Sequence, residues 1–275
     1  MREEPLRQID PPAAGVRCVP ERPGGAGVLV VAGSSGRIDV GRVWLLAAQG
    51  VLAESVRWFG GEGQSPGPYD VPIELFLARV AALRARCDRV VLVGLSFGAE
   101  AVLLTAAHAD GAVDAVAAFA PSDVAWAGVR PDGTQTSHWS IGGTPVPFVP
   151  FAEDWEPDDD PPSYAGMYRR AREVAPQRVA AAAIAVERIP TLLCVAGGDD
   201  RVWPAVEHAE AIRHRRALHG LATTVVTDAE AGHRTVLPGE AVVAGGQRMA
   251  RGGTETADRR LGERAWRELQ VLLGV

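Results

Sequence analysis

Ser96 is the residue whose surroundings point most directly to chemistry. It lies in Gly94-Leu95-Ser96-Phe97-Gly98, after the apolar run 90–93 and before a helix-forming segment at 101–107. The run has the length and β-branched content of a strand buried on both faces. Flanking glycines allow a sharp, strained turn from strand to helix that presents the serine at the strand end. The pattern predicts a nucleophilic serine; the alternative is a tight turn whose serine only caps the helix.

A serine hydroxyl needs a neutral imidazole as base, and that imidazole needs a carboxylate to orient it. On a strand-turn-helix scaffold the acid and then the histidine follow the serine, each after a later strand. Asp199 and Asp200 follow the strand-like run 190–196. We favour Asp200, because Gly-x-x-Asp followed by an apolar residue and a helix-opening proline is the usual context. Asp199 is the alternative, and the aspartate that is not catalytic is expected to cap the helix beginning at Pro204.

His233 is the predicted base. It follows Gly232 in a loop just beyond a strand predicted at 223–227, downstream of the acid. His138 lies in a segment of irregular pattern, where contact with substrate is conceivable but a surface position is expected. The remaining histidines fall in or at the ends of predicted helices: His108, His208, His214 and His219.

Acyl transfer through serine also needs two N–H groups that stabilise the tetrahedral oxygen. Phe97 supplies one of them, and the other is expected from Ser34, or alternatively Ser35, in the turn Gly33-Ser34-Ser35-Gly36. A phosphate-binding turn is the alternative for this stretch, although it lacks a P-loop lysine and the full dinucleotide fingerprint. Residues expected to contact substrate are Ser35, Trp203, Trp126 and Trp139.

Alternating strand and helix patterns surround these residues and predict an α/β fold with a mostly parallel central sheet flanked by helices. Strands are predicted at 28–32, 52–56, 90–95, 115–119, 190–196 and 223–227, and helices at 40–49, 72–87, 101–107, 204–218 and 254–273. Residues 1–26 are expected to form an N-terminal arm with one edge strand near 16–19, and residues 27–275 the main domain.

Residues 122–187 interrupt this alternation and hold several aromatic residues and an acidic, proline-rich run. We expect a lid inserted over the sheet, with helices near 163–173 and 176–186; a long solvated excursion is the alternative.

With 275 residues, 47% of them hydrophobic, the chain can bury a substantial core. Its formal net charge of −6 argues against nucleic acid as a partner. No stretch suggests a membrane span or signal peptide, so a soluble, cytoplasmic protein is expected. Cys87 and Cys194 are predicted to be buried thiols, and no zinc-type spacing occurs, so no metal is expected. Nothing in the sequence indicates an oligomeric state.

Together these motifs resemble an α/β-hydrolase, and more narrowly the catalytic domain of the acyl-CoA thioesterase and bile acid-CoA:amino acid N-acyltransferase family. The likeness runs from about Gly27 to the C-terminus. The pieces that carry it are AGSSG at 32–36, GLSFGAE at 94–100, AIAVERI at 183–189, GDDRVWP at 198–204, AGH at 231–233 and GGT at 252–254.

Two departures from that family matter. Members often carry an N-terminal β-sandwich domain, which the leading 26 residues are too few to form. The amino-acid-conjugating members use a cysteine nucleophile where this chain has Ser96. Because an oxygen ester is more readily lost to water, serine favours hydrolysis.

The sequence therefore predicts a serine hydrolase of small acyl thioesters or esters that requires no cofactor. The alternatives are acyl transfer to an amine or alcohol, and a hydrolase-like scaffold that binds a ligand without turnover. Two arginine clusters, at 169–172 and 213–216, are either contacts for the phosphates of a CoA-like thiol or plain solubilising charge.

Overall fold

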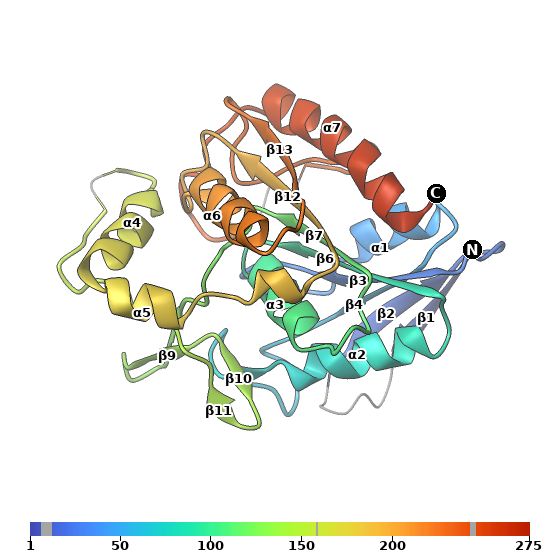
Figure 1. The fold of residues 1–275 in the computed structure, drawn as a ribbon, viewed down its shortest axis with the longest axis horizontal. Helices are drawn as coiled ribbons and strands as arrows, with labels where there is room; N and C mark the ends of the chain where they lie inside the picture. The colour runs from blue at the N-terminus through green and yellow to red at the C-terminus, as the bar shows by residue number, and fades with distance from the viewer. Residues whose placement is uncertain (7–12, 158, 243–245) are drawn as a thin grey trace.

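The computed structural model describes residues 1–6, 13–157, 159–242 and 246–275. Its centre is an eight-stranded sheet with the order β1-β2-β4-β3-β6-β7-β12-β13 (Figure 1). The strands from β4 to β13 in this order run parallel, whereas β2 is antiparallel to both β4 and β1. Their bounds are β1 Arg2–Leu6, β2 Gly15–Val19, β3 Ala26–Val31, β4 Leu52–Val56, β6 Arg89–Leu95, β7 Ala115–Phe119, β12 Thr191–Gly197 and β13 Thr224–Asp228.

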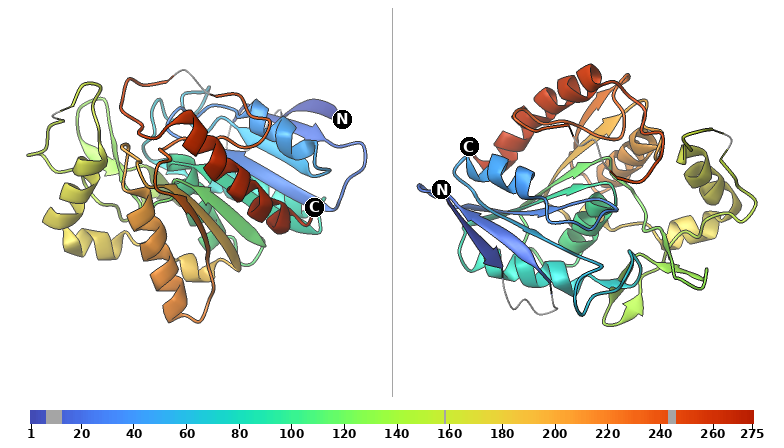
Figure 2. Two further views of the ribbon diagram at one scale, coloured as in Figure 1. Left: turned by 90° about the horizontal axis from the view of Figure 1, so that it is seen from above. Right: turned by 180° about the vertical axis from the view of Figure 1, so that it is seen from behind.

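Helices cover both faces of this sheet (Figures 1 and 2). Side chains alternate along β3, so that Val28 and Val30 pack on one face and Leu29 and Val31 on the other. The first face is covered by α1 (Val40–Ala47) and α7 (Glu255–Leu273), and the second by α2 (Glu74–Arg84), α3 (Phe97–Ala107) and α6 (Ala205–Leu218). Burial on both faces explains why these strands read as continuous apolar runs.

The α/β fold and its mostly parallel sheet are confirmed. The predicted strands at 52–56 and 115–119 have these bounds in the structure, and the other predicted strands and helices differ by a few residues at their ends. The strand expected near 16–19 is β2, but its predicted edge position is wrong, because β1 pairs with it on the outer side. The sequence does not predict β1, because Arg-Glu-Glu-Pro-Leu has little strand character. Cys87 and Cys194 are buried and unpaired, as predicted.

Residues 122–187 form a separate layer at one end of the molecule (Figures 1 and 2). The two predicted helices are α4 (Ala165–Val174) and α5 (Pro176–Ala181), the second shorter than expected. Strands of two or three residues were not predicted, because they are too short to show a period. They are β8 Ala127–Val129, β9 Gln135–Ser137, β10 Trp139–Ile141 and β11 Thr144–Pro145, with β5 (Val71–Pro72) paired to β10. A 3-10 turn, η1 (Val186–Arg188), leads back to β12.

Ion pairs attach this layer to the body of the protein. Asp123, which Arg172 of α4 binds within the layer at 2.8 and 3.1 Å, contacts the imidazole of His208 in α6. Arg169 of α4 binds Glu207 of α6 at 2.8 Å. In the part of the chain that the structure describes, no helix is long and apolar enough to cross a membrane.

Candidate active site

Ser96 forms the turn between β6 and α3. Its backbone has φ 58° and ψ −125°, a conformation that is costly for a residue with a Cβ atom. Gly94 and Gly98 make this turn possible: a Cβ on Gly94 would overlap the carbonyl of Gly98, and one on Gly98 would overlap the carbonyl of Val31. Ser96 is the N-cap residue of α3, and its carbonyl accepts the N–H groups of Ala99 and Glu100, but its side chain makes no capping hydrogen bond to the helix.

His233 and Asp200 form a buried pair. The imidazole Nδ1 lies 2.8 Å from Asp200 Oδ2. The other carboxylate oxygen, Oδ1, accepts the N–H groups of Val202 at 2.9 Å and Trp203 at 3.2 Å. These two donors hold the carboxylate so that Oδ2 faces the imidazole. With Nδ1–H donating to Asp200, Nε2 is left free to accept a proton.

Asp199 points away from His233. Its Oδ2 accepts the N–H of Gly253 at 2.8 Å, and its Oδ1 lies 3.1 Å from Nε of Arg201. The Gly253 N–H holds the pKa of Asp199 below its ordinary value, with a further contribution from Arg201. The expectation that the second aspartate caps the following helix is wrong, because α6 begins at Ala205 without a side-chain cap.

A turn of two glycines holds the acid and base loops together. Gly252 and Gly253 have φ values of +66° and +71°, which favour glycine. A Cβ on Gly252 would overlap the carbonyl of Asp199, and one on Gly253 would overlap the amide of Gly232. The preceding carbonyl, of Arg251, accepts the N–H of His233 at 2.9 Å. Backbone from residues 251–253 therefore packs between the two loops and positions both.

The turn at residues 33–36 lies directly beside Ser96. The N–H of Gly36 donates to the carbonyl of Gly33 at 2.9 Å and closes the turn around Ser34 and Ser35. A Cβ on Gly33 would lie 3.2 Å from the Cβ of Ser96. The Phe97 N–H opens α3, where the first N–H groups have no acceptor within the helix. The two predicted oxyanion donors, Ser34 and Phe97, thus belong to two segments that are in contact next to Ser96.

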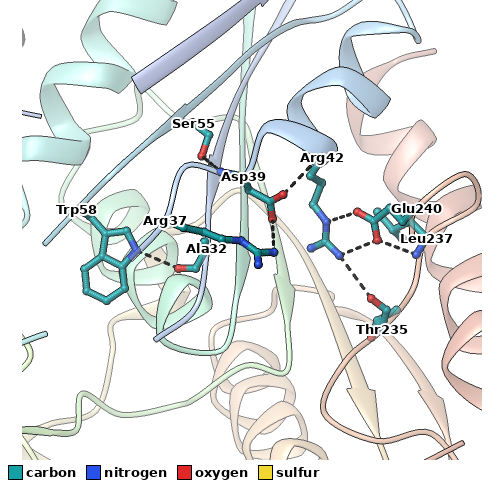
Figure 3. Close-up of polar contacts among 9 residues, drawn as sticks. All are labelled: Ala32, Arg37, Asp39, Arg42, Ser55, Trp58, Thr235, Leu237 and Glu240. Atoms are coloured by element: carbon teal, nitrogen blue, oxygen red, sulfur yellow. Dashed lines mark hydrogen bonds and ion pairs between the residues drawn. The ribbon is translucent and has the colours of Figure 1, made fainter. Parts of the chain in front are cut away.

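Side chains from neighbouring elements fix the ends of that turn (Figure 3). At its start, the indole N–H of Trp58 donates to the carbonyl of Ala32 at 3.0 Å. At its end, the N–H of Asp39 donates to Ser55 Oγ of β4 at 2.9 Å. Because both bonds are to residues in or just after β4, the sheet sets the position of the turn.

Ser96 and His233 line one cavity of about 1400 Å³. Ser34, Ser35 and Phe97 line it as well. The segment 122–187 contributes an apolar part of the wall: Val129, Phe151, Tyr164, Met167 and Tyr168. Ser96 is only 7% exposed, so a substrate carbonyl at the serine would be largely shielded from bulk water.

The three tryptophans predicted to contact substrate are fully buried, and the described lining of this cavity does not include them. Trp126 donates its indole N–H to Ser122 Oγ at 2.8 Å, and Trp139 donates to Glu100 Oε1 at 2.7 Å. Trp203 packs behind the site, with its ring 5.6 Å from Phe97 and 5.9 Å from His233. It packs against Phe97 and His233, and the other two tryptophans anchor the 122–187 layer.

His138 is buried, so the expected surface position is wrong. Its ring lies 4.0 Å from the ring of Phe97, and its Nδ1 is 3.6 Å from Glu100 Oε1. The sequence does not predict the contacts of His138 with Phe97 and Glu100, because residue 138 is far from both in the chain. The other four histidines lie in or at the ends of α3 and α6, as predicted.

The two arginine clusters, at 169–172 and 213–216, do not reach the cavity. None of their arginines is among the described residues that line it. The exposed members bind carboxylates on the same surface, as in Arg170 with Asp154 and Arg213 with Glu210. Arg216 is buried and donates to backbone carbonyls, including that of Val186 at 2.6 Å. Among the described residues, no group of histidine, cysteine and acidic side chains is arranged to hold a metal ion.

A sequence model described as "Alpha/beta hydrolase family" matches residues 28–245. The chain belongs to the alpha/beta hydrolase family. The matched region begins within β3 and contains β4, β6, β7, β12 and β13, the Ser96 turn and the Asp200–His233 pair. A search of curated protein sequences found no significant match.

Solved structures similar to this α/β hydrolase share its fold over the whole chain. A putative dienelactone hydrolase from Klebsiella pneumoniae has a TM-score of 0.57 and 14% identity, over 100% of this chain and 99% of its own. MGS-M1, an α/β hydrolase from a deep-sea metagenome of the Medee basin, has a TM-score of 0.60 and 14% identity with the same coverage. The metagenomic phosphotriesterase P91 has a TM-score of 0.53 and 16% identity, over 99% and 97%. At such identities the likeness establishes the fold alone.

Proposed function

We propose that this α/β hydrolase cleaves small acyl thioesters and esters through an acyl-serine intermediate. The observation that carries the proposal is the 2.8 Å contact between His233 Nδ1 and Asp200 Oδ2, at a cavity that His233 and the strained Ser96 both line. A ligand-binding scaffold has no need of this combination. We therefore assign Ser96 as the nucleophile, His233 as the base and Asp200 as the residue that orients His233.

In the first step His233 Nε2 takes the proton of the Ser96 hydroxyl while Oγ bonds to the substrate carbonyl carbon. The N–H groups of Phe97 and Ser34 are the proposed donors to the negative oxygen of the tetrahedral intermediate. The bond to the leaving thiol or alcohol breaks, and His233 gives that group its proton. Water then attacks the acyl-serine with His233 as base, releasing a carboxylic acid and restoring Ser96.

We further propose that residues 122–187 serve as a lid on a single hydrolase domain spanning 27–275, with residues 1–26 as its N-terminal arm. The five apolar residues that this segment contributes to the cavity wall support that role, because they suit an acyl chain. The resemblance to acyl-CoA thioesterases is the reason for including thioesters. A shielded serine also suits transfer of the acyl group to an amine or alcohol, since fewer water molecules compete for the acyl-enzyme.

Labelling with a fluorophosphonate, read by intact-protein mass spectrometry, tests the assignment. We expect one adduct on the wild type and none on Ser96→Ala. Ser34→Ala is the matched control, because it removes an exposed hydroxyl from the same cavity and keeps the backbone N–H. Labelling of Ser96→Ala, or a folded wild type that does not react, would refute the proposal. Addition of an amine during turnover then separates hydrolysis from transfer by the product formed.

A further inference from the structure

The side chain of Arg42 crosses from α1 to the loop that follows the predicted base. Figure 3 shows it extending from the helix toward Thr235 and Glu240. Its Nε binds Glu240 Oε1 at 2.6 Å, and a terminal nitrogen binds Oε2 of the same carboxylate at 3.1 Å. That terminal nitrogen also lies 3.4 Å from the carbonyl oxygen of Thr235, two residues after His233. One guanidinium group therefore holds the loop 234–240 at two points.

Arg42 also contacts the segments that support the turn at 33–36 and Ser96. Its backbone N–H donates to Asp39 Oδ1 at 3.4 Å, in the segment that follows the turn. Its guanidinium carbon lies 5.0 Å from the centre of the Phe119 ring at the end of β7, within the range of a cation–π contact. The carbonyl of Phe119 accepts the N–H of Ser96 at 2.9 Å. Arg42 thus lies between the loop after the predicted base and the supports of the proposed nucleophile.

Arg42 and Glu240 form a buried ion pair in the wall of the cavity. Arg42 is only 5% exposed, and both residues line the cavity. Burial opposes ionisation of Glu240, but the charge and hydrogen bonds of Arg42 outweigh it and hold the pKa of Glu240 below its ordinary value. Glu240 Oε2 also accepts the N–H of Leu237 at 2.9 Å, which fixes the carboxylate within its own loop. Because both carboxylate oxygens bind one planar guanidinium, the pair fixes direction as well as distance.

We propose that Arg42 is a positioning residue that, with Glu240, holds the loop after His233 so that Nε2 stays aligned with the leaving-group oxygen. The inference rests on the proposed function, because only a base that also protonates a leaving group needs this alignment. The Asp200 carboxylate and the Arg251 carbonyl already hold the ring and the N–H of His233. The Arg42–Glu240 pair restrains the chain that leaves the histidine.

Stability alone does not account for this pair. A buried ion pair can often be replaced by uncharged residues of similar volume with little loss of stability, whereas removal of one partner leaves a buried charge unpaired. A double variant that removes both charges therefore separates the two roles. It should fold, and it should lack the alignment that the pair provides.

Two esters with one acyl group measure the alignment. Phenyl butyrate and p-nitrophenyl butyrate give the same butyryl-serine and differ only in the leaving group. The p-nitrophenolate leaves readily as an anion, whereas the phenolate depends more on the proton that His233 donates. The ratio of the two kcat/KM values, phenyl over p-nitrophenyl, therefore reports how well His233 is aligned. An unfolded fraction lowers both values equally and leaves the ratio unchanged.

We expect Arg42→Met/Glu240→Gln to fold with a thermal midpoint close to that of the wild type, because the glutamine oxygen can still accept the Leu237 N–H. Its kcat/KM for the phenyl ester should fall about 10-fold or more, and the ratio of the two esters about 5-fold, since a small misplacement weakens proton transfer. Arg42→Lys keeps a charge for Glu240 but lacks the planar fork, and should lower the ratio about 3-fold.

Arg79→Met is the matched control. Arg79 is a buried arginine that binds Glu54 at 2.6 Å, and the described lining of the cavity includes neither residue. Glu54 keeps a second partner in Arg17, at 2.6 Å. This variant should lose stability and keep the wild-type ratio.

An unchanged ratio in either folded Arg42 variant, with an active wild type, would overturn the positioning role and leave the pair a structural one. An equal fall of the ratio in Arg79→Met would overturn it as well, because general loosening of the fold would then explain the effect. If the wild type cleaves neither ester and Ser96 takes no fluorophosphonate, the proposed function has failed, and the role of Arg42 fails with it.

Discussion

The two adjacent aspartates provide a sharp test of the proposed active site. They carry the same charge and lie side by side in the chain, yet only Asp200 contacts His233. In Asp200→Asn, Oδ1 can still accept the N–H groups of Val202 and Trp203. The new NH₂ group then faces His233 Nδ1. Because two donors cannot pair, the imidazole must place its proton on Nε2, where it can no longer accept the serine proton.

We expect Asp200→Asn to reduce kcat by about 10⁴-fold, the size of a tautomer error in a serine triad. This corresponds to about 5 kcal/mol of transition-state stabilisation. In Asp199→Asn the side-chain oxygen that accepts the Gly253 N–H is retained, and the aspartate is 42% exposed, so a change of only a few-fold is expected. The assay is kcat on one ester substrate, with circular dichroism and thermal melting to show that both variants fold.

The reasoning would be refuted if folded Asp200→Asn kept more than a tenth of the wild-type kcat. It would also be refuted if Asp199→Asn proved the more damaging change. Either result would mean that the 2.8 Å contact does not set the protonation state of His233.

Three further predictions concern the Ser96 turn, the attachment of the 122–187 layer and a buried thiol. Gly98→Ala should reduce kcat at least 100-fold, because its Cβ would overlap the Val31 carbonyl. Asp123→Asn should lower the free energy of unfolding at pH 7 by about 2 kcal/mol. Burial opposes ionisation of Asp123, but His208 and Arg172 outweigh it and lower its pKa from 3.8 to about 2. This stabilisation is present above pH 4 and is lost as the pH falls toward 2, so urea titrations should show wild type and variant converging over that range. Cys194, whose pKa burial raises to about 12, should resist thiol reagents at pH 8 until the protein unfolds; rapid reaction in the native state would contradict its burial.

The strands and the nucleophile turn were predictable because their signals are local. The apolar run before Ser96 predicts the strand, and the glycines around Ser96 predict the turn. In the same way, Gly232 and the strand pattern before it predict that His233 lies in a loop just beyond a strand. Asp200 and His233 follow neighbouring parallel strands, β12 and β13, so the order of the chain was enough to place them at one edge of the sheet.

Side chains in the 122–187 layer were not predictable in this way. Trp126 and Trp139 look like substrate contacts in a sequence, because aromatic residues near an active site serve either purpose. Both bond to residues of other segments and lie in the core. His138 is buried against Phe97 and Glu100, and the hydrophobic periodicity of a local segment cannot predict contacts between residues so far apart in the chain.

The turn at Gly252 and Gly253 determines which parts of the candidate active site can form first while the chain is being synthesised. A chain is synthesised from its N-terminus, and early segments begin to fold while later ones are still absent. β6 and Ser96 leave the ribosome long before residue 253. The Asp199 carboxylate and the His233 amide find their backbone partners only in residues 251–253. The turn that bears the proposed nucleophile can therefore form early in synthesis, whereas the loops that carry Asp200 and His233 gain these backbone contacts only after residue 253 has been made.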